Sequence, residues 1–292
     1  MRGRDELVTY LQRALGYAIT GSTREQVLFF LFGVGANGKS TLLEAVKSVM
    51  GPDYSVEAAP GLLLSKNSEQ HPAERAQLFR KRLVTTIEVE DGRRFAESWV
   101  KQLTGSDQIT ARRMREDFWS FDPTHKIFLA ANHKPEIRGT DPAIWRRIRL
   151  IPFEATFSGG KQDKTLQEKL AAECEGILAW LVAGAVSWHR DGLQAPREVL
   201  AATETYRSEQ DVLGDFVAEC CVEGNDSLTA SSAELYDAYT RWHRDAVGGQ
   251  ALTQTAFGRR LAEKGFLKAR FTGGPSKGKN YWKGVGLVKS EG

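Results

Sequence analysis

Apolar residues recur along the chain either at helical spacing or in short unbroken runs. Residues 6–15 show helical periodicity, and residues 27–32 form a continuous apolar and aromatic run that is typical of a buried strand. A glycine-rich turn follows, and helical periodicity returns at 41–50 before it stops at Gly51 and Pro52. These patterns predict the order helix, strand, loop, helix.

Two further buried strands are predicted at 82–89 and 126–131. A helical pattern at 95–103 and a polar, hairpin-like stretch lie between them. Buried strands that alternate with helices favour an α/β fold, in which a central parallel sheet is covered by helices on both faces.

Small polar residues at 158–164 and at 224–227 predict domain boundaries. Helical patterns lie at 166–188, 232–246 and 253–264, and a glycine- and lysine-rich hairpin follows the last of them. We therefore predict an N-terminal helical segment (1–25), a sheet-containing core (26–157), a helical lid or linker (158–225) and a small C-terminal domain (226–292).

Composition and charge narrow the functional class. Of 292 residues, 41% are hydrophobic and 26% charged, as in a globular protein with a real core. The net charge of +3 is small, but residues 259–289 are distinctly basic, which is compatible with a nucleic-acid partner. The three cysteines form no C-x-x-C pair, and residues 176–186 are too short to span a bilayer. We expect a cytoplasmic protein without a membrane partner.

A phosphate-binding sequence follows the first predicted strand. Residues 33–40 fit G-x-x-x-x-G-K-S and stand between a predicted strand and a predicted helix, as a P-loop requires. Backbone N–H groups and the helix N-terminus would face the phosphates of ATP, Lys39 would bridge the β- and γ-phosphates, and Ser40 would be a ligand of Mg²⁺. The expected binding residues are Gly33, Gly35, Ala36, Asn37, Gly38, Lys39, Ser40 and Thr41.

A P-loop needs an acidic partner at the end of a neighbouring strand. Glu88 ends the second predicted strand, and Glu90 and Asp91 follow closely. One carboxylate would organise Mg²⁺ while another activates water, and the spacing does not decide which. Glu90 and Asp91 also fit ordinary loop charges exposed to solvent.

Two polar features follow the third predicted strand. Asn132 ends that strand, where an amide can orient water towards a γ-phosphate, although asparagine is also common in turns. Arg146 and Arg147 precede another apolar run, and a guanidinium there can stabilise the charge on a transferred phosphoryl group. A surface salt-bridge cluster is the alternative for this pair.

These stretches together resemble the superfamily 3 helicases, and within them the C-terminal motor of phage, plasmid and viral primase-helicases of the poxvirus D5-like and P4-like kind. The resemblance covers nearly the whole chain. It is carried by the phosphate loop, by residues 101–107 with Arg112, by residues 132–135 and by residues 144–147.

The resemblance implies an AAA+-like ATPase core at 26–157 that assembles as a homo-hexamer around single-stranded DNA and moves 3′ to 5′. It implies that Glu88 organises the metal, that Asn132 is the sensor residue and that Arg147 is the arginine finger acting on the adjacent subunit, with Arg146 as its nearest rival. Residues 109–121 would form a hairpin that grips DNA in the ring channel. The expected phosphate contacts in this hairpin are Arg112, Arg113 and Arg115.

The C-terminal domain at 226–292 resembles the small winged-helix domain that follows many such motors. Residues 253–264 would be the recognition helix, with exposed Arg259 and Arg260, and residues 268–283 would be a basic wing carrying Lys277 and Lys279. This arrangement favours contact with duplex DNA. A protein-docking module with a solvated basic face is the alternative.

We therefore expect an ATP-dependent DNA helicase motor for phage, plasmid or viral DNA replication, acting in the cytoplasm of a bacterial host. Relatives usually carry a primase or another domain ahead of the motor, and no primase chemistry is expected in this chain. The alternatives are a DNA-binding ATPase that does not translocate and an origin-binding replication initiator.

Overall fold

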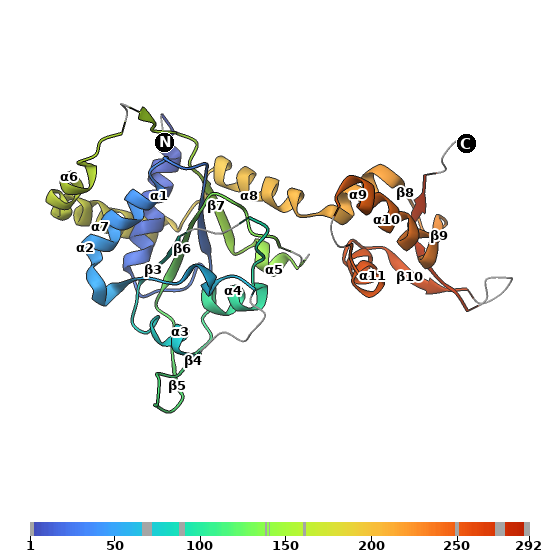
Figure 1. The fold of residues 1–292 in the computed structure, drawn as a ribbon, viewed down its shortest axis with the longest axis horizontal. Coiled ribbons are helices and arrows are strands. Elements are labelled where there is room, and N and C mark those ends of the chain that lie inside the picture. Colours follow the sequence, from blue (N-terminus) through green and yellow to red (C-terminus); the bar gives the residue numbers. More distant parts are fainter. Residues whose placement is uncertain are drawn as a thin grey trace. The chain divides into compact units, whose positions relative to one another are not determined.

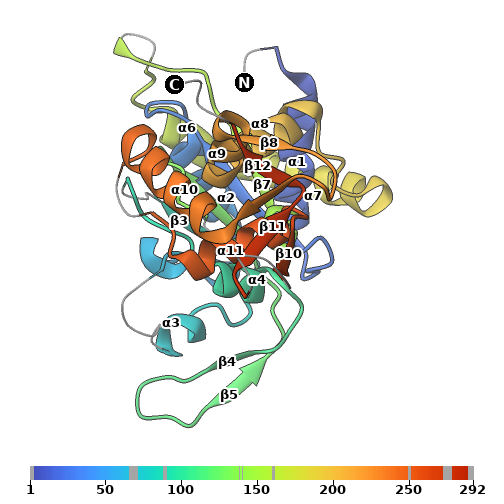
Figure 2. The ribbon, with the colours of Figure 1, turned by 90° about the vertical axis from the view of Figure 1, so that its right-hand side faces the viewer.

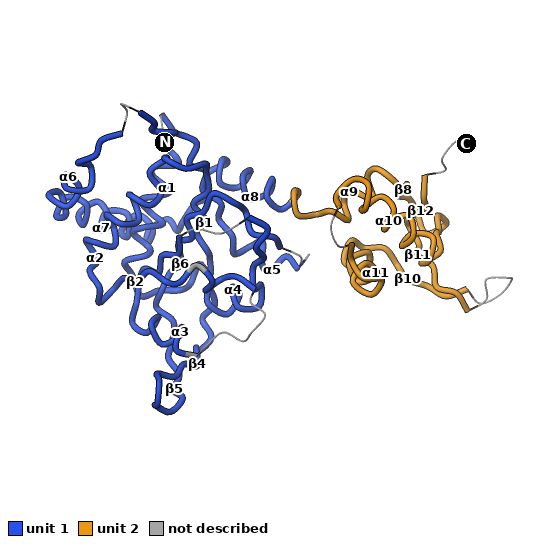
Figure 3. Tube along the Cα trace, viewed as in Figure 1, with its two compact units in different colours: residues 1–207 blue, residues 208–292 orange. Residues whose placement is uncertain are grey.

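The computed structural model describes residues 3–65, 72–87, 91–137, 139, 141–159, 162–248, 251–271 and 278–288. The chain divides into two compact units, residues 1–207 and residues 208–292 (Figure 3). Each unit has its own hydrophobic core and is described by itself.

A five-stranded sheet forms the centre of the first unit, and every neighbouring pair of its strands is parallel (Figure 1). In spatial order the strands are β2 (Ser55–Glu57), β3 (Leu83–Ile87), β6 (Lys126–Ala131), β1 (Leu28–Phe32) and β7 (Ile148–Pro152). The predicted α/β fold with a central parallel sheet is thus confirmed.

The central strand β1 is apolar along its length because both of its faces are buried. Leu28 and Phe30 point into one core, whereas Phe29 and Leu31 point into the other. The first core is covered by η1 (Pro60–Leu62), α3 (Pro72–Ala76), α4 (Glu97–Thr104) and α5 (Pro142–Trp145). The second core is covered by α1 (Asp5–Ile19), α2 (Lys39–Tyr54) and α7 (Cys174–Asp191). Two further helices are α6 (Leu166–Ala172) and α8 (Arg197–Glu209).

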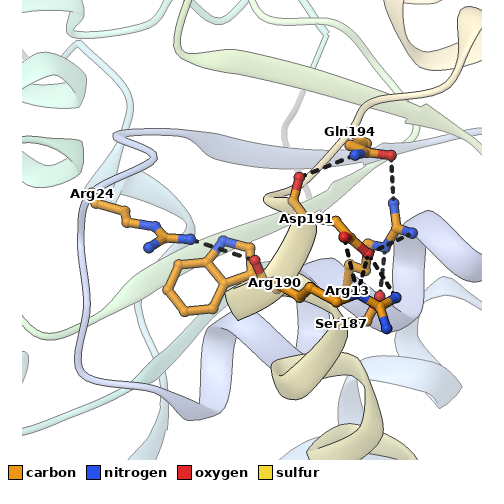
Figure 4. Close-up of polar contacts among 7 residues, drawn as sticks. Arg13, Arg24, Ser187, Arg190, Asp191 and Gln194 are labelled. Carbon is orange, nitrogen blue, oxygen red and sulfur yellow. Dashed lines mark hydrogen bonds and ion pairs between the residues drawn. The ribbon is translucent and has the colours of Figure 1, made fainter.

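Helices α1 and α7 cross at very short range. A Cβ atom at Gly16 or at Gly184 would overlap the backbone of the other helix, so only glycine allows this approach. Arg13 of α1 donates to Ser187 Oγ at 2.9 Å, and its Nη2 lies 3.8 Å from Asp191 Oδ2 (Figure 4). The helix in the predicted N-terminal segment at 1–25 is therefore packed into the sheet-containing unit.

The same corner of the unit holds a second arginine. The Arg24 guanidinium stacks 4.0 Å from the centre of the Trp188 ring and donates to the Trp188 carbonyl oxygen at 3.4 Å (Figure 4). Trp188 Nε1 in turn donates to Glu25 at 2.8 Å. These contacts fix the turn that leads from α1 into β1, and hence the strand that carries the predicted phosphate loop.

A short antiparallel hairpin leaves the first unit beyond α4. Its strands are β4 (Ile109–Ala111) and β5 (Trp119–Phe121), with Ile109 opposite Phe121. Both ribbon views show the tip of the hairpin extending away from the sheet (Figures 1 and 2). The hairpin predicted at 109–121 is therefore present.

The second unit combines three helices with short strands around an aromatic core. The helices are α9 (Val212–Cys220), α10 (Ser232–Ala246) and α11 (Gln254–Glu263). The strands are β8 (Cys221–Glu223), β9 (Thr229–Ser231), β10 (Leu267–Arg270), β11 (Asn280–Lys283) and β12 (Val285–Leu287), in the sheets β10-β11-β9 and β12-β8. Ser231 and Thr253 cap α10 and α11 by accepting hydrogen bonds from backbone N–H groups of the first turn.

The second unit begins earlier than the predicted boundary at 226. Helix α9 belongs to it because Leu213, Phe216 and Val217 are buried in the same core as Phe257 and Trp282. Small polar residues at 224–227 mark only a turn inside this unit, between β8 and β9. The division after Arg207 thus replaces the predicted division after residue 225.

Among the described residues, no single helix has both the length and the apolar character that a membrane span requires. The pair α6 and α7, bent by 73° at their junction, meets that test of length and composition only when the two helices are taken together.

Candidate functional site

The glycine-rich loop connects β1 to α2, as the sequence predicts. Ala36 and Gly38 have positive φ values of 56° and 86°, and α2 begins at Lys39 directly after them. Gly33 is packed so closely that a Cβ atom there would overlap the Phe153 carbonyl oxygen. The shape of the loop therefore depends on glycine at 33 and 38 for two different reasons, close approach and backbone conformation.

The segment after β7 holds this loop in place. Asn37 Nδ2 donates to the Val34 carbonyl oxygen at 2.9 Å and to the Phe153 carbonyl oxygen at 3.1 Å. Phe157 N donates to the Ala36 carbonyl oxygen at 2.7 Å. The loop is thus fixed from both sides before any ligand arrives.

Lys39 is the buried cation of the loop. Lys39 is only 5% exposed. Its Nζ donates hydrogen bonds to the Gly33 carbonyl oxygen at 2.6 Å, to Asn37 Oδ1 at 3.0 Å and to Asn132 Oδ1 at 2.9 Å. Burial lowers the pKa of the Lys39 ammonium. None of its three partners carries a charge, so an anion can replace one of them with a gain in electrostatic energy.

A cavity of about 270 Å³ lies at the carboxyl edge of the sheet, beside Lys39. It is lined by Gly35, Ala36, Asn37, Gly38, Lys39, Ser40, Thr41, Ile87, Ala130, Ala131 and Asn132. The first turn of α2 borders it, so the unpaired N–H groups of a helix N-terminus face an anion bound there. The cavity, the buried ammonium and the tight loop fit the phosphates of a nucleotide.

The cavity brings together most of the predicted nucleotide contacts. Ser40 and Asn132 are both exposed and offer oxygen atoms of the kind that Mg²⁺ prefers. Glu88 and Glu90 lie outside the described residues, but the strand that leads to them ends at Ile87, which lines the cavity. Asp91 Oδ1 lies 3.6 Å from His133 Nδ1, and both side chains are exposed. The sequence offered no signal for this last pair.

The arginine pair lies at the other edge of the same sheet. The Arg147 carbonyl oxygen accepts a hydrogen bond from Leu28 N at 2.7 Å, at the start of β1. Strands β1 and β7 then run parallel and in register, and the glycine-rich loop leaves β1 at its far end. Within one chain, neither Arg146 nor Arg147 joins the cavity.

The two arginines differ sharply in exposure. Arg147 is 8% exposed, and its Nη1 donates to the Ala143 carbonyl oxygen at 2.7 Å, which ties it to α5. Burial and the neighbouring Arg146 lower the pKa of Arg147. Arg146 is exposed to solvent. The geometry therefore favours Arg146 for contact with another molecule, whereas the resemblance places Arg147 first.

The β4–β5 hairpin carries its predicted cations on the surface. Arg112, Arg113 and Arg115 are all exposed. Arg112 stacks 4.8 Å from the centre of the Phe118 ring, and Phe118 is 59% exposed. Trp119 instead packs edge-on against Phe79, with ring centres 4.7 Å apart. Of the three aromatic residues in the hairpin, Phe118, Trp119 and Phe121, only Phe118 has an exposed side chain that can meet a ligand.

The predicted cations of the second unit differ in their exposure to solvent. Arg259 is exposed and lies 3.9 Å from Glu263 in an ion pair, and Lys279 is exposed. Arg260 is only 6% exposed, so the expectation that it faces solvent is wrong. Residue 260 shares the buried face of α11 with Phe257 and Leu261, because residues three and four apart lie on one side of a helix.

One cation predicted in the C-terminal hairpin cannot be compared with the structure, and one feature of this hairpin was not predicted. Lys277 lies outside the described residues. The sequence reasoning missed a ring pair at the base of the hairpin, where Phe271 and Tyr281 stack with their centres 4.2 Å apart. Alternation of residues along β10 and β11 was the signal that could have found it, since it places the two rings on one face.

Comparison with known proteins bears on both units. Residues 31–147 match a family of unknown function, DUF5906, and residues 208–284 match the family described as poxvirus D5 protein-like. The chain is 29% identical over 262 residues to "Putative helicase L207/L206" of Acanthamoeba polyphaga mimivirus, and 24% identical over 255 residues to "Putative primase C962R" of African swine fever virus. The D5-like resemblance is confirmed.

The chain spans about a quarter of the length of these relatives. The matches cover 82% and 80% of the chain but only 27% and 26% of the two relatives. A solved structure of the NrS-1 C-terminal region aligns with a TM-score of 0.55 at 13% identity, covering 95% of this chain and 71% of that one. That structural similarity shows a shared fold.

Proposed function

We propose that this chain is the ATP-dependent motor of a superfamily 3 DNA helicase that serves phage, plasmid or viral DNA replication. The observation that carries the proposal is the division of the reaction machinery between the two edges of one sheet. Lys39 and Asn132 meet at the carboxyl edge, and the arginine pair lies at the amino edge. Relatives named as helicase and primase support a role in DNA replication.

The cavity residues have clear tasks in ATP hydrolysis. Lys39 exchanges its bond to Asn132 for the β- and γ-phosphates, and the backbone N–H groups of the loop surround the β-phosphate. Asn132, released from Lys39, orients the attacking water. Ser40 and Glu88 would hold Mg²⁺, which neutralises charge on the phosphates when it is bound.

The position of the arginines supports a site shared between subunits. Strand β7 has five residues, so at about 3.3 Å per residue it separates the arginine pair from its own phosphate loop by about 17 Å. An arginine finger must therefore come from a neighbouring copy. We assign this role to Arg146, because its side chain is exposed while Arg147 is committed to Ala143. A ring of copies, expected to be a homo-hexamer, supplies such neighbours.

Several features support an AAA+-like core that grips DNA. The strand order β2-β3-β6-β1-β7 places the strand before the glycine-rich loop between two parallel neighbours. The exposed arginines of the β4–β5 hairpin, Arg112, Arg113 and Arg115, suit phosphates of a single strand in a ring channel. Movement from 3′ to 5′ and a place in the bacterial cytoplasm follow from the resemblance and belong to the proposal.

The second unit suits a winged-helix assignment. Helices α10 and α11 are followed by the β10–β11 hairpin, and exposed Arg259 and Lys279 lie on the last helix and the hairpin. Contact with duplex DNA is the role that this arrangement favours.

A strand-displacement assay on forked duplexes of both polarities tests the helicase. The wild type should separate the fork with a 3′ single-stranded arm in the presence of ATP and Mg²⁺, and single-stranded DNA should stimulate its ATP turnover. Lys39→Ala should lose both activities. A wild type that hydrolyses ATP but separates neither fork indicates a non-translocating ATPase. Sequence-specific duplex binding without DNA-stimulated turnover indicates an origin-binding initiator.

A further inference from the structure

We propose that the outer face of the β10-β11-β9 sheet binds single-stranded DNA by stacking bases on the Phe271–Tyr281 ring pair. This surface excludes the β4–β5 hairpin and helix α11, and Lys279 is the residue that it shares with the duplex contact proposed above. It goes beyond the duplex contact proposed above for the second unit, and it does not depend on ATP turnover.

The strand register defines the face. Ala269 pairs with Tyr281 and Leu267 with Lys283, and the hydrogen bond from Phe271 N to the Lys279 carbonyl oxygen, 3.0 Å long, continues this pairing. Residues directly opposite each other in an antiparallel pair share a face. Because side chains alternate, β10, β11 and the adjoining residues place Leu267, Ala269, Phe271, Lys279, Tyr281 and Lys283 on this face. Strand β9 adds Thr229 and Ser231, which pair with Lys283 and Tyr281.

The opposite face of the same strands belongs to the core. Trp282 is buried there, and a Cβ atom at Gly258 of α11 would lie 3.4 Å from its ring. Lys268, opposite Trp282, lies with its Nζ 5.9 Å from the centre of that ring. Helix α11 therefore covers one side of the sheet, and the ring pair lies on the other.

The outer face has the chemistry of a stacking platform. The Phe271 and Tyr281 rings lie 4.2 Å apart with 27° between their planes, and neither residue is buried. Leu267 beside them is 57% exposed. Apolar and aromatic surface left open on a sheet is unfavourable unless a partner covers it, and unpaired bases cover it by π stacking.

Charge on this face suits a polyanion. Lys279 is exposed at the edge of the ring pair, and Lys283 is partly exposed two residues beyond Tyr281. None of the residues named on this face is acidic, so phosphates meet no repulsion from the face itself. Stacked bases with cations alongside the backbone are the usual means of binding single strands without sequence preference.

A single strand fits this face better than a duplex does. The bases of a duplex are stacked on one another inside the helix, so their flat surfaces are closed to protein side chains. An unpaired strand exposes these surfaces to aromatic residues. The aromatic rings on the outer face of the sheet therefore favour unpaired bases. Helix α11, which carries Arg259, is instead suited to a groove of duplex DNA.

Photocrosslinking of the full chain to oligodeoxythymidine that carries iododeoxyuridine tests the proposal directly. With no nucleotide present, crosslinks should map by mass spectrometry to the peptides that contain Phe271 or Tyr281. Arg112→Ala with Arg113→Ala should leave these crosslinks in place. Crosslinks confined to residues 109–121 or to α11 overturn the proposal.

Binding measurements provide the second readout. Phe271→Ala or Tyr281→Ala should weaken oligodeoxythymidine binding by about 5- to 140-fold, since one base stack contributes about 1–3 kcal/mol and about 1.4 kcal/mol corresponds to tenfold. Tyr281→Phe keeps the ring and should bind like the wild type. Unchanged affinity in both alanine variants, at unchanged thermal stability, contradicts the proposal. If an alanine variant does not fold, the crosslinks of the wild-type protein alone test whether the ring pair contacts DNA.

The salt dependence gives a matched control for charge. Lys279→Ala removes a cation from the outer face and should reduce the slope of log affinity against log salt by about 0.7. Lys268→Ala removes a cation from the same hairpin on the opposite face and should leave the slope unchanged. Equal slopes for both variants, or a duplex that competes as well as the single strand, overturn the assignment.

Discussion

Nζ of Lys39 donates a hydrogen bond to Oδ1 of Asn132 across 2.9 Å, so the cation of the glycine-rich loop is held by the residue that directly follows β6. The two residues are far apart in the sequence and meet because β1 and β6 are neighbouring parallel strands. Without a nucleotide, the amide keeps the ammonium in the cavity. When ATP binds, phosphate is expected to replace Asn132 as the partner of Lys39.

Substitution of Asn132 should separate nucleotide binding from turnover. Asn132→Ala removes the group that orients water and should lower kcat for ATP by about 100-fold, with little loss of ATP affinity. Asn132→Asp should instead weaken ATP binding at least about tenfold, because a carboxylate pairs with Lys39 and repels the triphosphate. Steady-state kinetics and equilibrium binding of a fluorescent ATP analogue measure both effects. Equal losses of affinity in the two variants contradict this assignment.

Two glycines of the loop should respond differently to one added methyl group. Gly33→Ala places a Cβ atom against the Phe153 carbonyl oxygen, so the loop must move and ATP binding should fall below detection. Gly35→Ala meets no atom within 4 Å and should bind ATP within a few fold of the wild type. Isothermal titration with ATP and Mg²⁺ compares the two. Normal ATP binding by Gly33→Ala would show that the segment after β7 can move to accommodate the added Cβ atom.

The exposed and the buried arginine should differ in stability and in catalysis. Arg147→Ala leaves the Ala143 carbonyl oxygen without its donor and should lower the free energy of unfolding by about 1–3 kcal/mol. Arg146→Ala should change it by less than about 0.5 kcal/mol but abolish DNA-stimulated ATP turnover. Chemical unfolding and ATPase assays measure these effects.

Mixing variants tests whether the finger acts across subunits. Arg146→Ala subunits mixed with Lys39→Ala subunits should regain part of the ATPase activity, because some interfaces then pair an intact loop with an intact arginine. Mixtures of Arg147→Ala with Lys39→Ala serve as the comparison. Recovery only in the second mixture would return the role to Arg147.

Acid should destabilise the first unit through His125. This side chain is buried at the start of β6, and Nε2 lies 3.1 Å from the Leu103 carbonyl oxygen. Burial lowers the pKa of His125 from 6.5 to about 4, so between these values the unfolded chain binds a proton that the folded chain excludes. The free energy of unfolding should therefore fall as pH falls from 6.5 to about 4, by at most about 1.4 kcal/mol per pH unit.

His125→Gln isolates this contribution. Glutamine keeps a donor for the Leu103 carbonyl oxygen but does not titrate, whereas the carboxylates of the chain titrate alike in both proteins. The difference in unfolding free energy between wild type and variant should change with pH in that window and remain constant above it. A constant difference throughout indicates that His125 is protonated in the fold.

The strands at the centre of the sheet could be predicted because a run of apolar residues is a local feature of the sequence. Residues 28–32 and 127–131 are apolar without interruption since both faces of their strands are buried, and the glycine-rich loop needs only its own residues to be recognised. The loop and Asn132 were expected at one site, and the structure brings them to one cavity. This meeting of the loop and Asn132 could be predicted because each follows a parallel strand, and the carboxyl ends of parallel strands lie at one edge of the sheet.

Other features depend on tertiary packing that no local pattern records. The Asn37 amide bridges the loop to Phe153, and nothing near residue 37 indicates that partner. Arg260 was read as exposed by its charge alone, although Phe257 and Leu261 place it on the buried face of α11. Small polar residues marked a boundary at 224–227, while Phe216 in the core of the second unit shows that they are an internal turn.

The parallel register of β1 has a consequence for synthesis of the chain. Leu28 pairs with Ile127 on one side and with Ile148 on the other, so this strand, the most aromatic of the sheet, leaves the ribosome long before either neighbour exists. Its unpaired edges and apolar side chains are a hazard for self-association during that interval. Helix α1, already made, can cover only one of its two faces, which makes the nascent chain a natural client for holding chaperones until β7 has emerged.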